Sequence, residues 1–431
     1  MLEQIKQYLR FTSWPIITAM IALMVIGVLA IRVSERGDQT MYGFTVKQVR
    51  YAAVGLAVFV AATVVPYHRF GRWAYPLMGL TIGLLVLVLF LPPIRHSHRW
   101  IDLRFLKVQP SEVAKLAFIL VLAWYLRSGD NYRRLVGLLV PFAIALVPMG
   151  LILREPDLGT SLLFLPTLLI MLFMAGAKIR HLAGVVAIAA VVVLLPVPRR
   201  IPSDTTRAEL ADRRAMAYWH TERYVVSPLP LAIMKSHQVD RIDGWLRQGN
   251  PAVRMGKGYQ LHQSKMIFGA GGLTGRGDWY DADTFFRMLP DDHTDFIFSV
   301  VGGQWGFVGC LAVLFLYAVI FVFGVEIASI THDAFGRLLA VGVLALLFTQ
   351  LVINIGMTMG LMPITGMTLP LVSYGGSSLV VNCAALGLLV NVGQRRPILL
   401  GKRPFEYGDR APKPPAPFGP LGHSGARPVT R

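Results

Sequence analysis

The chain has 431 residues, of which 54% are hydrophobic and only 15% are charged, and its mean hydropathy is positive. This composition departs from that of a soluble globular protein and indicates an integral membrane protein. The formal net charge is +18. Membrane loops that carry Lys and Arg account for most of this charge, because basic residues are retained on the cytoplasmic side of a membrane. Nucleic acid is therefore not an expected partner.

Ten apolar runs predict transmembrane helices, since a helix needs roughly 17 to 25 residues to cross a hydrocarbon core. In chain order, the runs lie near residues 14–31, 50–66, 74–92, 113–126, 135–153, 160–176, 182–197, 295–325, 335–360 and 369–392. Backbone polar groups inside a membrane must be satisfied within the segment, which helices achieve. The sequence therefore predicts an all-α integral membrane protein with about ten transmembrane helices.

These spans divide the chain into four parts. Spans 1–7 occupy residues 1–197 and spans 8–10 occupy residues 295–396. A large extracytoplasmic loop, residues 198–294, is predicted between spans 7 and 8. The tail at 397–431 is rich in Pro, Gly and Arg, which indicates a disordered cytoplasmic extension.

Basic residues in the short loops set the predicted orientation. Lys6 and Arg10 precede the first span, and Arg395 and Arg396 follow the last. Because such residues stay on the cytoplasmic side, both termini are predicted to be cytoplasmic in a multi-pass protein of the inner (plasma) membrane. The loop 92–109 departs from this rule.

That loop is predicted to lie outside, yet it carries Arg95, Arg99, Arg104 and Lys107. An outward basic cluster is suited to an anionic ligand such as a pyrophosphate, since guanidinium groups donate paired hydrogen bonds to phosphate oxygens.

The stretch Leu289–Phe298 places four ionisable side chains directly before the eighth span. Charged groups at the mouth of a membrane span are costly and usually functional. Partial desolvation would raise the basicity of Asp295, which makes it a candidate general base. Alternatively, Asp295 caps the helix that follows.

Other polar residues within the spans have structural and functional interpretations. Glu112 and Lys115 are three residues apart on one helical face, where they either pair or contribute to a site. Asn354 is expected to form an interhelical hydrogen bond. Cys310 and Cys383 lie in apolar spans and are predicted to be packing residues.

Four separated motifs occur in order along the chain. They are Arg99-Trp100 with Gln109–Lys115; Pro156–Thr160; Lys235, Gln238 and Arg241 with Tyr259-Gln260, Ser264-Lys265, Gly269–Gly277 and His293–Phe296; and Pro363 and Gly366 with Leu369–Ser378. Together they resemble the motifs of the SEDS family (shape, elongation, division and sporulation), which includes RodA and FtsW. Residues 354–357 before Met362-Pro363 are more similar to the RodA branch. The resemblance covers about residues 14 to 396.

The resemblance implies a peptidoglycan glycosyltransferase that polymerises lipid II during cell elongation and releases polyprenyl diphosphate. It also implies a class B penicillin-binding transpeptidase as partner and Asp295 as the general base. The candidate substrate-binding residues are Arg99, Lys107, Glu112, Lys115, Arg241, Lys265 and Ser377. No metal-ligand spacing is evident, although a divalent cation between Asp295 and the pyrophosphate is chemically reasonable.

A lipid-linked precursor flippase is the alternative function. A transporter needs polar residues along a path through the membrane, whereas the polar residues here gather at the outer edge, which favours an enzyme. The chain also departs from the family. Residues 302–306 lack the acidic pair of the family's GEE.G pattern, and the segment around 198–234 is longer than usual.

Overall fold

The computed structural model describes residues 11–37, 43–92, 99–102, 107–129, 131–155, 157–200, 219–220, 224–228, 236–276, 289 and 292–395. Contacts divide the chain into one unit up to Arg396 and a second from Pro397 to Arg431. The second unit, with the predicted disordered tail, lies outside the described residues.

Helices make up most of the described chain. The apolar helices are α2 (Trp14–Gly37), α3 (Phe44–Val64), α5 (Ala74–Phe90), α6 (Pro110–Leu126), α7 (Leu139–Arg154), α8 (Leu158–Ala175), α9 (Ile179–Leu194), α15 (Ile297–Ile330), α16 (Ala334–Thr358) and α17 (Gly376–Gln394). The shorter connecting helices are α4 (Tyr67–Arg72), α12 (Ser236–Leu246), α13 (Pro251–Arg254) and α14 (Tyr259–Ala270), with 3₁₀ turns η2 (Asn131–Arg133) and η3 (Val136–Leu138).

Among the described residues, seven helices are long and apolar enough to cross a membrane, and α5 and α9 are shorter apolar helices. The protein is therefore an all-α multi-pass membrane protein, while the number of crossings stays a prediction. Several helices depart from the predicted boundaries. Helix α3 begins at Phe44 rather than near 50, α2 and α15 extend to Gly37 and Ile330 rather than near 31 and 325, and α17 begins at Gly376 rather than near 369, because residues 359–375 form a loop.

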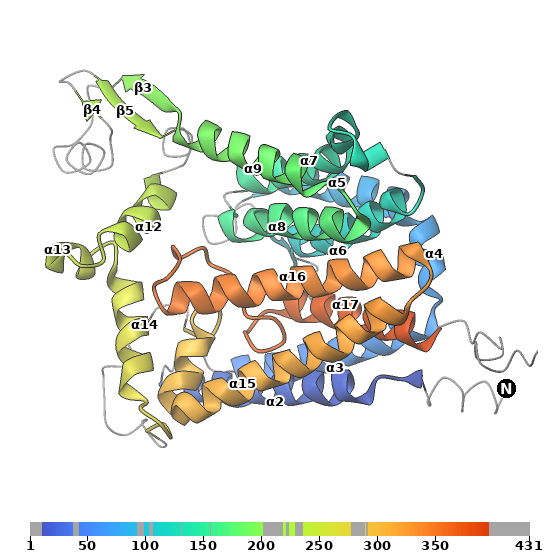
Figure 1. Cartoon of the computed structure of the whole chain (residues 1–431). Helices are drawn as coiled ribbons and strands as arrows, with labels where there is room; N and C mark the ends of the chain where they lie inside the picture. The colour runs from blue at the N-terminus through green and yellow to red at the C-terminus, as the bar shows by residue number, and fades with distance from the viewer. Residues whose placement is uncertain are drawn as a thin grey trace, which may run out of the picture. The chain divides into compact units, whose positions relative to one another are not determined.

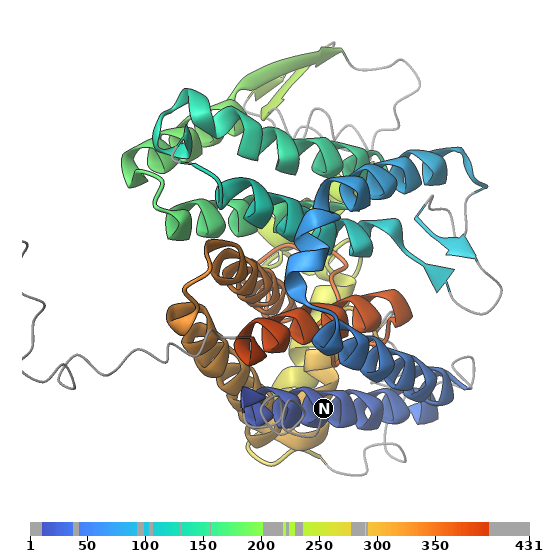
Figure 2. The same ribbon diagram turned by 90° about the vertical axis from the view of Figure 1, so that its right-hand side faces the viewer.

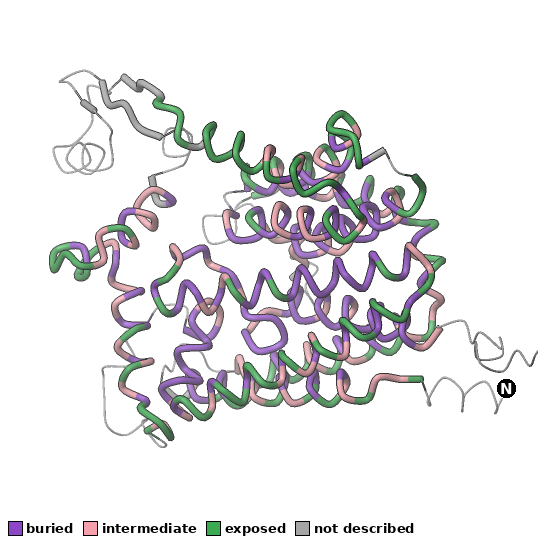
Figure 3. The backbone as a smooth tube through the Cα atoms, viewed as in Figure 1, coloured by how far each residue is buried: buried purple, intermediate pink, exposed green. Residues whose placement is uncertain are grey.

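The helices lie side by side in a bundle (Figures 1 and 2). Helix α17 packs along α3, α15 along α2, and α16 along α6 and α8. Figure 3 shows that α16 and α17 are largely buried, whereas α9 is largely exposed. Many of the exposed side chains on the outer helices are apolar, as expected where a helix faces lipid.

The strands β3–β5 and the helices α12–α14 lie at one end of the bundle, on the left of Figure 1, and α4 lies at the opposite end. We call the former the α12 end. It carries the antiparallel sheet β3–β5–β4, formed by β3 (Pro196–Arg200), β5 (Tyr224–Pro228) and β4 (Trp219–His220). A two-stranded sheet pairs β1 (Ile101–Asp102) with β2 (Lys107–Val108). Much of the predicted insertion at 198–234 lies outside the described residues.

Candidate active site at the α12 end

The loop that joins α16 to α17, residues 359–375, organises the candidate site; we call it the connecting loop. Ser373 ties it to the turn before α15, because its Oγ donates to the Thr294 carbonyl at 2.6 Å. The same Oγ accepts from the Leu369 amide at 2.8 Å, and the Tyr374 amide donates to the His293 carbonyl at 2.9 Å. The connecting loop and the turn that carries Asp295 are therefore held together.

Asp295 and Arg241 approach the same point of this loop. Gly366 has φ +73°, and a Cβ added there would lie 3.3 Å from both Asp295 Oδ2 and Arg241 Nη1. Only glycine adopts this backbone conformation freely and leaves space for both groups. Residues from α12, from the turn before α15 and from the connecting loop thus converge. The N-cap residue of α15 is Phe296, so Asp295 precedes the cap position.

Asn354 hydrogen-bonds to both of these segments. This fully buried side chain donates from Nδ2 to the carbonyl of Asp295 at 2.9 Å and to that of Met367 at 2.6 Å. These partners are backbone carbonyls of the turn before α15 and of the connecting loop, rather than the neighbouring helix that the sequence suggested. Asn354 therefore fixes the position of the backbone on either side of the Asp295–Gly366 approach.

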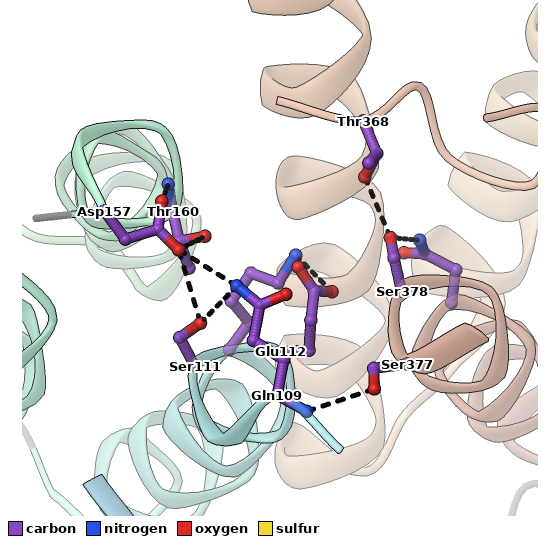
Figure 4. A network of polar contacts seen from close by, with 10 residues as sticks. Gln109, Ser111, Glu112, Asp157, Thr160, Thr368, Ser377 and Ser378 are labelled. Carbon is purple, nitrogen blue, oxygen red and sulfur yellow. Dashed lines mark hydrogen bonds and ion pairs between the residues drawn. The ribbon is translucent and has the colours of Figure 1, made fainter. Parts of the chain in front are cut away.

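A second polar cluster joins the beginnings of α6, α8 and α17 (Figure 4). At its centre, Asp157 accepts from Thr160 N at 3.1 Å, Thr160 Oγ1 at 2.9 Å and Gln109 Nε2 at 3.0 Å. Ser111 Oγ lies 3.4 Å from Asp157 Oδ2, and the backbone N–H of Gln109 donates to Ser377 Oγ at 3.1 Å. Asp157 is also the N-cap of α8, so one carboxylate both starts a helix and links it to its neighbours.

Glu112 and Lys115 lie in the same cluster and form an ion pair of 2.7 Å between Oε2 and Nζ. Both side chains are buried, with exposures of 7% and 2%. Pairing was one of the two interpretations of their spacing, and it is confirmed. A buried pair such as this is costly to desolvate, so it is weak evidence for a stabilising role.

The two groups of residues are adjacent. A Cβ added at Gly159, in the first turn of α8, would lie 2.9 Å from the Thr365 carbonyl and against the side chain of Met367. These two residues flank Gly366. Across the cluster, Thr368 Oγ1 lies 3.0 Å from Ser378 Oγ (Figure 4). The connecting loop thus lies between the Asp157 cluster and Asp295.

Arg99 borders the site through Glu155. Its Nε donates to the Glu155 carbonyl at 2.8 Å. The Glu155 side chain is fully buried, and neither carboxyl oxygen has a hydrogen-bond partner among the described residues. The pKa of Glu155 is raised to about 8: burial is the largest cause, the charge of Asp157 also raises it, and the charge of Arg99 lowers it. The uncharged form of this carboxyl is therefore favoured at neutral pH.

Lys265 lies on another side of the connecting loop. Its Nζ donates to Gln248 Oε1 at 3.1 Å, and Gln248 and Trp245 donate to the Gly360 carbonyl at 3.3 and 3.0 Å. The backbone of Lys107 lies in β2, and its side chain is outside the described atoms. Among the predicted cationic residues, Arg241 therefore lies near Asp295 at Gly366. Arg99 lies beside Glu155, and Lys265 lies beside Gln248.

Residues 302–306, which lack the acidic pair of the family's GEE.G pattern, lie where α15 bends. Gly306 has φ 62° and ψ −157°, and the Phe307 amide donates to the Gly272 carbonyl at 2.9 Å. A Cβ at Gly302 would lie 2.7 Å from the ring of Phe268. Cβ atoms added at Gly271 and Gly275 would meet the carbonyls of Gly302 and Gln304, so the glycines permit close packing of residues 271–275 on α15.

Within the described residues, no group of three or more His, Cys, Asp or Glu side chains could hold a metal ion. A divalent cation remains a prediction.

The sequence indicated no role for Asp157 or Gln109, although both lie in motifs, because their contacts join helices that are distant in sequence.

The sequence matches the family described as "Cell cycle protein" and named for FtsW, RodA and SpoVE, over residues 7–397. The chain is an all-α multi-pass membrane protein and belongs to this family. It is 33% identical to the peptidoglycan glycosyltransferase RodA of Treponema pallidum, over 88% of this chain and 97% of the relative. It is 32% identical to the probable peptidoglycan glycosyltransferase FtsW of Trichlorobacter lovleyi, over 81% and 83%.

Solved structures agree with this assignment. A chain from the structure "Structural coordination of polymerization and crosslinking by a peptidoglycan synthase complex" superimposes with a TM-score of 0.70 at 27% identity, covering 90% of this chain and 99% of that one. The rod shape determining protein RodA of Thermus thermophilus gives a TM-score of 0.61 at 26% identity, with 90% and 98% covered.

Proposed function

We propose that the chain is a peptidoglycan glycosyltransferase that polymerises lipid II into glycan strands and releases polyprenyl diphosphate. The observation that carries this proposal is the approach of Asp295 Oδ2 and Arg241 Nη1 to Gly366. The names of the relatives, which are peptidoglycan glycosyltransferases, support the same activity.

The reaction needs a base and a cation close together. A sugar hydroxyl is a weak acid, so a carboxylate must accept its proton as the hydroxyl attacks the anomeric carbon of the donor. General base catalysis of this kind contributes typically ~10² to 10⁴-fold. Asp295 accepts that proton, and attack opposite the leaving group inverts the anomeric carbon.

The bond that breaks leaves its electrons on a polyprenyl diphosphate. Arg241 stabilises this negative charge, because a guanidinium donates paired hydrogen bonds to phosphate oxygens. Arg99, Lys107 and Lys265 extend the basic surface for the diphosphate and the growing strand. Glu112, Lys115 and Ser377 contribute to substrate binding through the Asp157 cluster.

Cell context follows from the same relatives. We propose that the chain lies in the inner (plasma) membrane with cytoplasmic termini, the α12 end outside, and a role in elongation. A class B penicillin-binding transpeptidase is the proposed partner; the structural neighbour described as coordinating polymerization and crosslinking supports it.

The test is polymerisation of labelled lipid II by the purified full-length protein, with and without a candidate transpeptidase. Wild type, Asp295→Asn and the control Asp292→Asn are compared at matched thermal stability. We expect polymer from wild type and the control, and at least ~10²-fold less from Asp295→Asn. Polymer from Asp295→Asn at the wild-type rate would exclude Asp295 as base. If no protein makes polymer even with the partner, a flippase becomes the better proposal.

A further inference from the structure

The end of the bundle that carries α4 presents arginines that the proposed chemistry does not use. Arg69 and Arg72 on α4, Arg127 after α6 and Arg337 on α16 are all exposed, and α4 packs against both α6 and α16. This end lies opposite the α12 end (Figure 1). Cations gathered on neighbouring helices are suited to an anionic ligand.

Arg127 is held in one orientation by Trp124. Its guanidinium carbon lies 3.2 Å from the centre of the Trp124 ring, which is a cation–π contact. Stacking covers a face of the planar guanidinium, whereas the N–H donors point outward from its edge. Because Arg127 is exposed, this edge faces the surroundings of the protein. The side chain is therefore pre-organised to donate paired hydrogen bonds to a phosphate.

The same tryptophan brings α4 to this place. A Cβ added at Gly71 would collide with the Trp124 ring, so the missing side chain lets α4 approach it closely. Arg72 is the next residue in the chain and is exposed. Arg72 and Arg127 thus flank one tryptophan from two different helices, which gathers two guanidinium groups on one surface.

Asp333 also lies at this end, but its carboxylate is engaged elsewhere. It accepts from Gly336 N at 2.8 Å and from Tyr67 Oη at 3.1 Å, and Oδ2 lies 3.5 Å from His68 Nε2. These partners belong to the first turn of α4 and the start of α16, whereas Arg72 is the last residue of α4. Asp333 therefore does not neutralise Arg72.

The two arginines lie at the depth of lipid headgroups. Trp73 and Tyr75 follow Arg72 at the start of the apolar helix α5, and they are 69% and 51% exposed. Exposed Trp and Tyr side chains at the ends of such helices are typical of the membrane–water interface. Arg127 likewise follows the last residue of the apolar helix α6. An anion between the two arginines is therefore level with phospholipid phosphates, which favours a lipid over a soluble anion.

We propose that Arg72 and Arg127 bind the phosphodiester of an anionic phospholipid, with Trp73 and Tyr75 against its glycerol and upper acyl chains. This site lies at the opposite end of the bundle from Asp295 and does not depend on the polymerase function. In the orientation proposed above, the lipid belongs to the cytoplasmic leaflet, whose anionic lipids attract basic segments.

The bound lipid also holds the ends of two helices. Tyr67, at the start of α4, donates from Oη to Asp333, the N-cap of α16, and from its backbone N–H to Asn391 Oδ1 on α17 at 3.3 Å. The other ends of α16 and α17 carry the connecting loop. A headgroup at α4 therefore anchors both of these helices to the membrane surface.

The test measures lipid binding directly. The full-length protein in nonionic detergent is titrated with phosphatidylglycerol, phosphatidylcholine or inorganic phosphate, and bound lipid is counted by native mass spectrometry. The site variant combines Arg72→Gln with Arg127→Gln, and a second variant with lysine at both positions keeps the charge but removes the paired donors. The matched control, Arg134→Gln with Arg180→Gln, removes two exposed arginines near the starts of α7 and α9.

We expect the site variant to bind phosphatidylglycerol at least about tenfold more weakly than wild type, because two arginines at a membrane surface together contribute at least that factor. The lysine variant should be intermediate, and the control should change by less than about threefold. Wild type should prefer phosphatidylglycerol to phosphatidylcholine, and inorganic phosphate should not displace the lipid. If loss of the contact with Trp124 prevents folding, Arg72→Gln compared with Arg134→Gln carries the test.

Four results would overturn the proposal. Equal weakening in the site variant and the control would show a diffuse positive surface without a site. Unchanged binding by the site variant would exclude the two arginines as ligands of the lipid. Equal affinity for phosphatidylcholine would exclude recognition of an anionic headgroup, and displacement by inorganic phosphate would identify a soluble anion as the ligand. None of these readouts uses polymerisation, so failure of the proposed function is observed separately.

Discussion

Gly366 is the residue on which the proposed chemistry depends most closely. Gly366→Ala forces an alanine into φ +73° and puts its Cβ 3.3 Å from Asp295 Oδ2 and Arg241 Nη1. The two groups must shift by a few tenths of an ångström, whereas a misplacement near 1 Å costs about 10²-fold in rate. We therefore expect kcat for lipid II polymerisation to fall by about tenfold, with a much smaller change in KM.

Gly43→Ala is the matched control, because Gly43 has φ +86° and an added Cβ would meet nothing within 4 Å. Both variants should lose a similar ~1 to 2 kcal/mol of stability from backbone strain. Only Gly366→Ala should lose turnover. Equal kinetic losses in both variants would mean that strain, not the approach to Asp295, causes the effect.

Glu155 gives a pH-dependent prediction at the same scale. Its pKa of about 8 lies above the ordinary 4.5, so folding favours the protonated carboxyl. The stabilisation is complete below about pH 4.5 and is lost as pH rises toward and through about 8. Glutamine at position 155 has no ionisable side chain, so Glu155→Gln should remove this pH-dependent loss of stability.

Thermal midpoints between about pH 5 and 9 check the prediction. Wild type should lose stability progressively over this range relative to Glu155→Gln. Parallel curves for the two proteins would show that Glu155 is ionised or accessible in the folded state.

At the scale of elements, several residues of the candidate site lie at the N-termini of helices. Asp157 caps α8 and also accepts from Gln109 in the candidate site. Asp333 caps α16 by accepting from Gly336 N at 2.8 Å and also accepts from Tyr67 Oη at 3.1 Å, at the opposite end of the bundle. Asp157→Ala and Asp333→Ala should each cost about 1 kcal/mol through the lost cap. Only Asp157→Ala should also reduce polymerisation, because it releases α6 from α8. Melting curves and rates measured on the same samples separate the two effects; an equal kinetic loss from Asp333→Ala would contradict this role.

The elements that sequence predicted best are the long apolar helices. Runs such as 335–360 correspond closely to α16, because length and apolarity suffice to define a membrane helix. The connecting loop was missed in part, since its apolar residues from 369 onward extended the predicted span. Its structure depends on Ser373, whose bond to the Thr294 carbonyl joins segments far apart in sequence.

The same limit applies to the site. Motifs indicated Asp295 and Arg241 as candidates, but nothing in their spacing revealed that Gly366 brings them together. Asn354 was expected to bond another helix, yet it bonds the carbonyls of Asp295 and Met367. Residue types are visible in sequence, whereas partners chosen by tertiary packing are not.

At the scale of the whole molecule, orientation in the membrane is a prediction with a direct test. Cys310 and Cys383 are buried, which gives a low labelling background. Gly249→Cys at the α12 end and Ser128→Cys between α6 and α7 both introduce exposed thiols. In intact cells, an impermeant maleimide should label only the first variant, and permeabilisation should expose the second. The reverse pattern would invert the topology.

The central claim is that Asp295 and Arg241 act on one transition state, and a double-mutant cycle tests it most directly. Lipid II polymerisation rates are measured for wild type, Asp295→Asn, Arg241→Gln and the double variant at matched stability. Residues that act as a unit are strongly non-additive, so the double variant should be little slower than the slower single variant. If the two losses instead multiply, Asp295 and Arg241 act independently, and a shared site at Gly366 is contradicted.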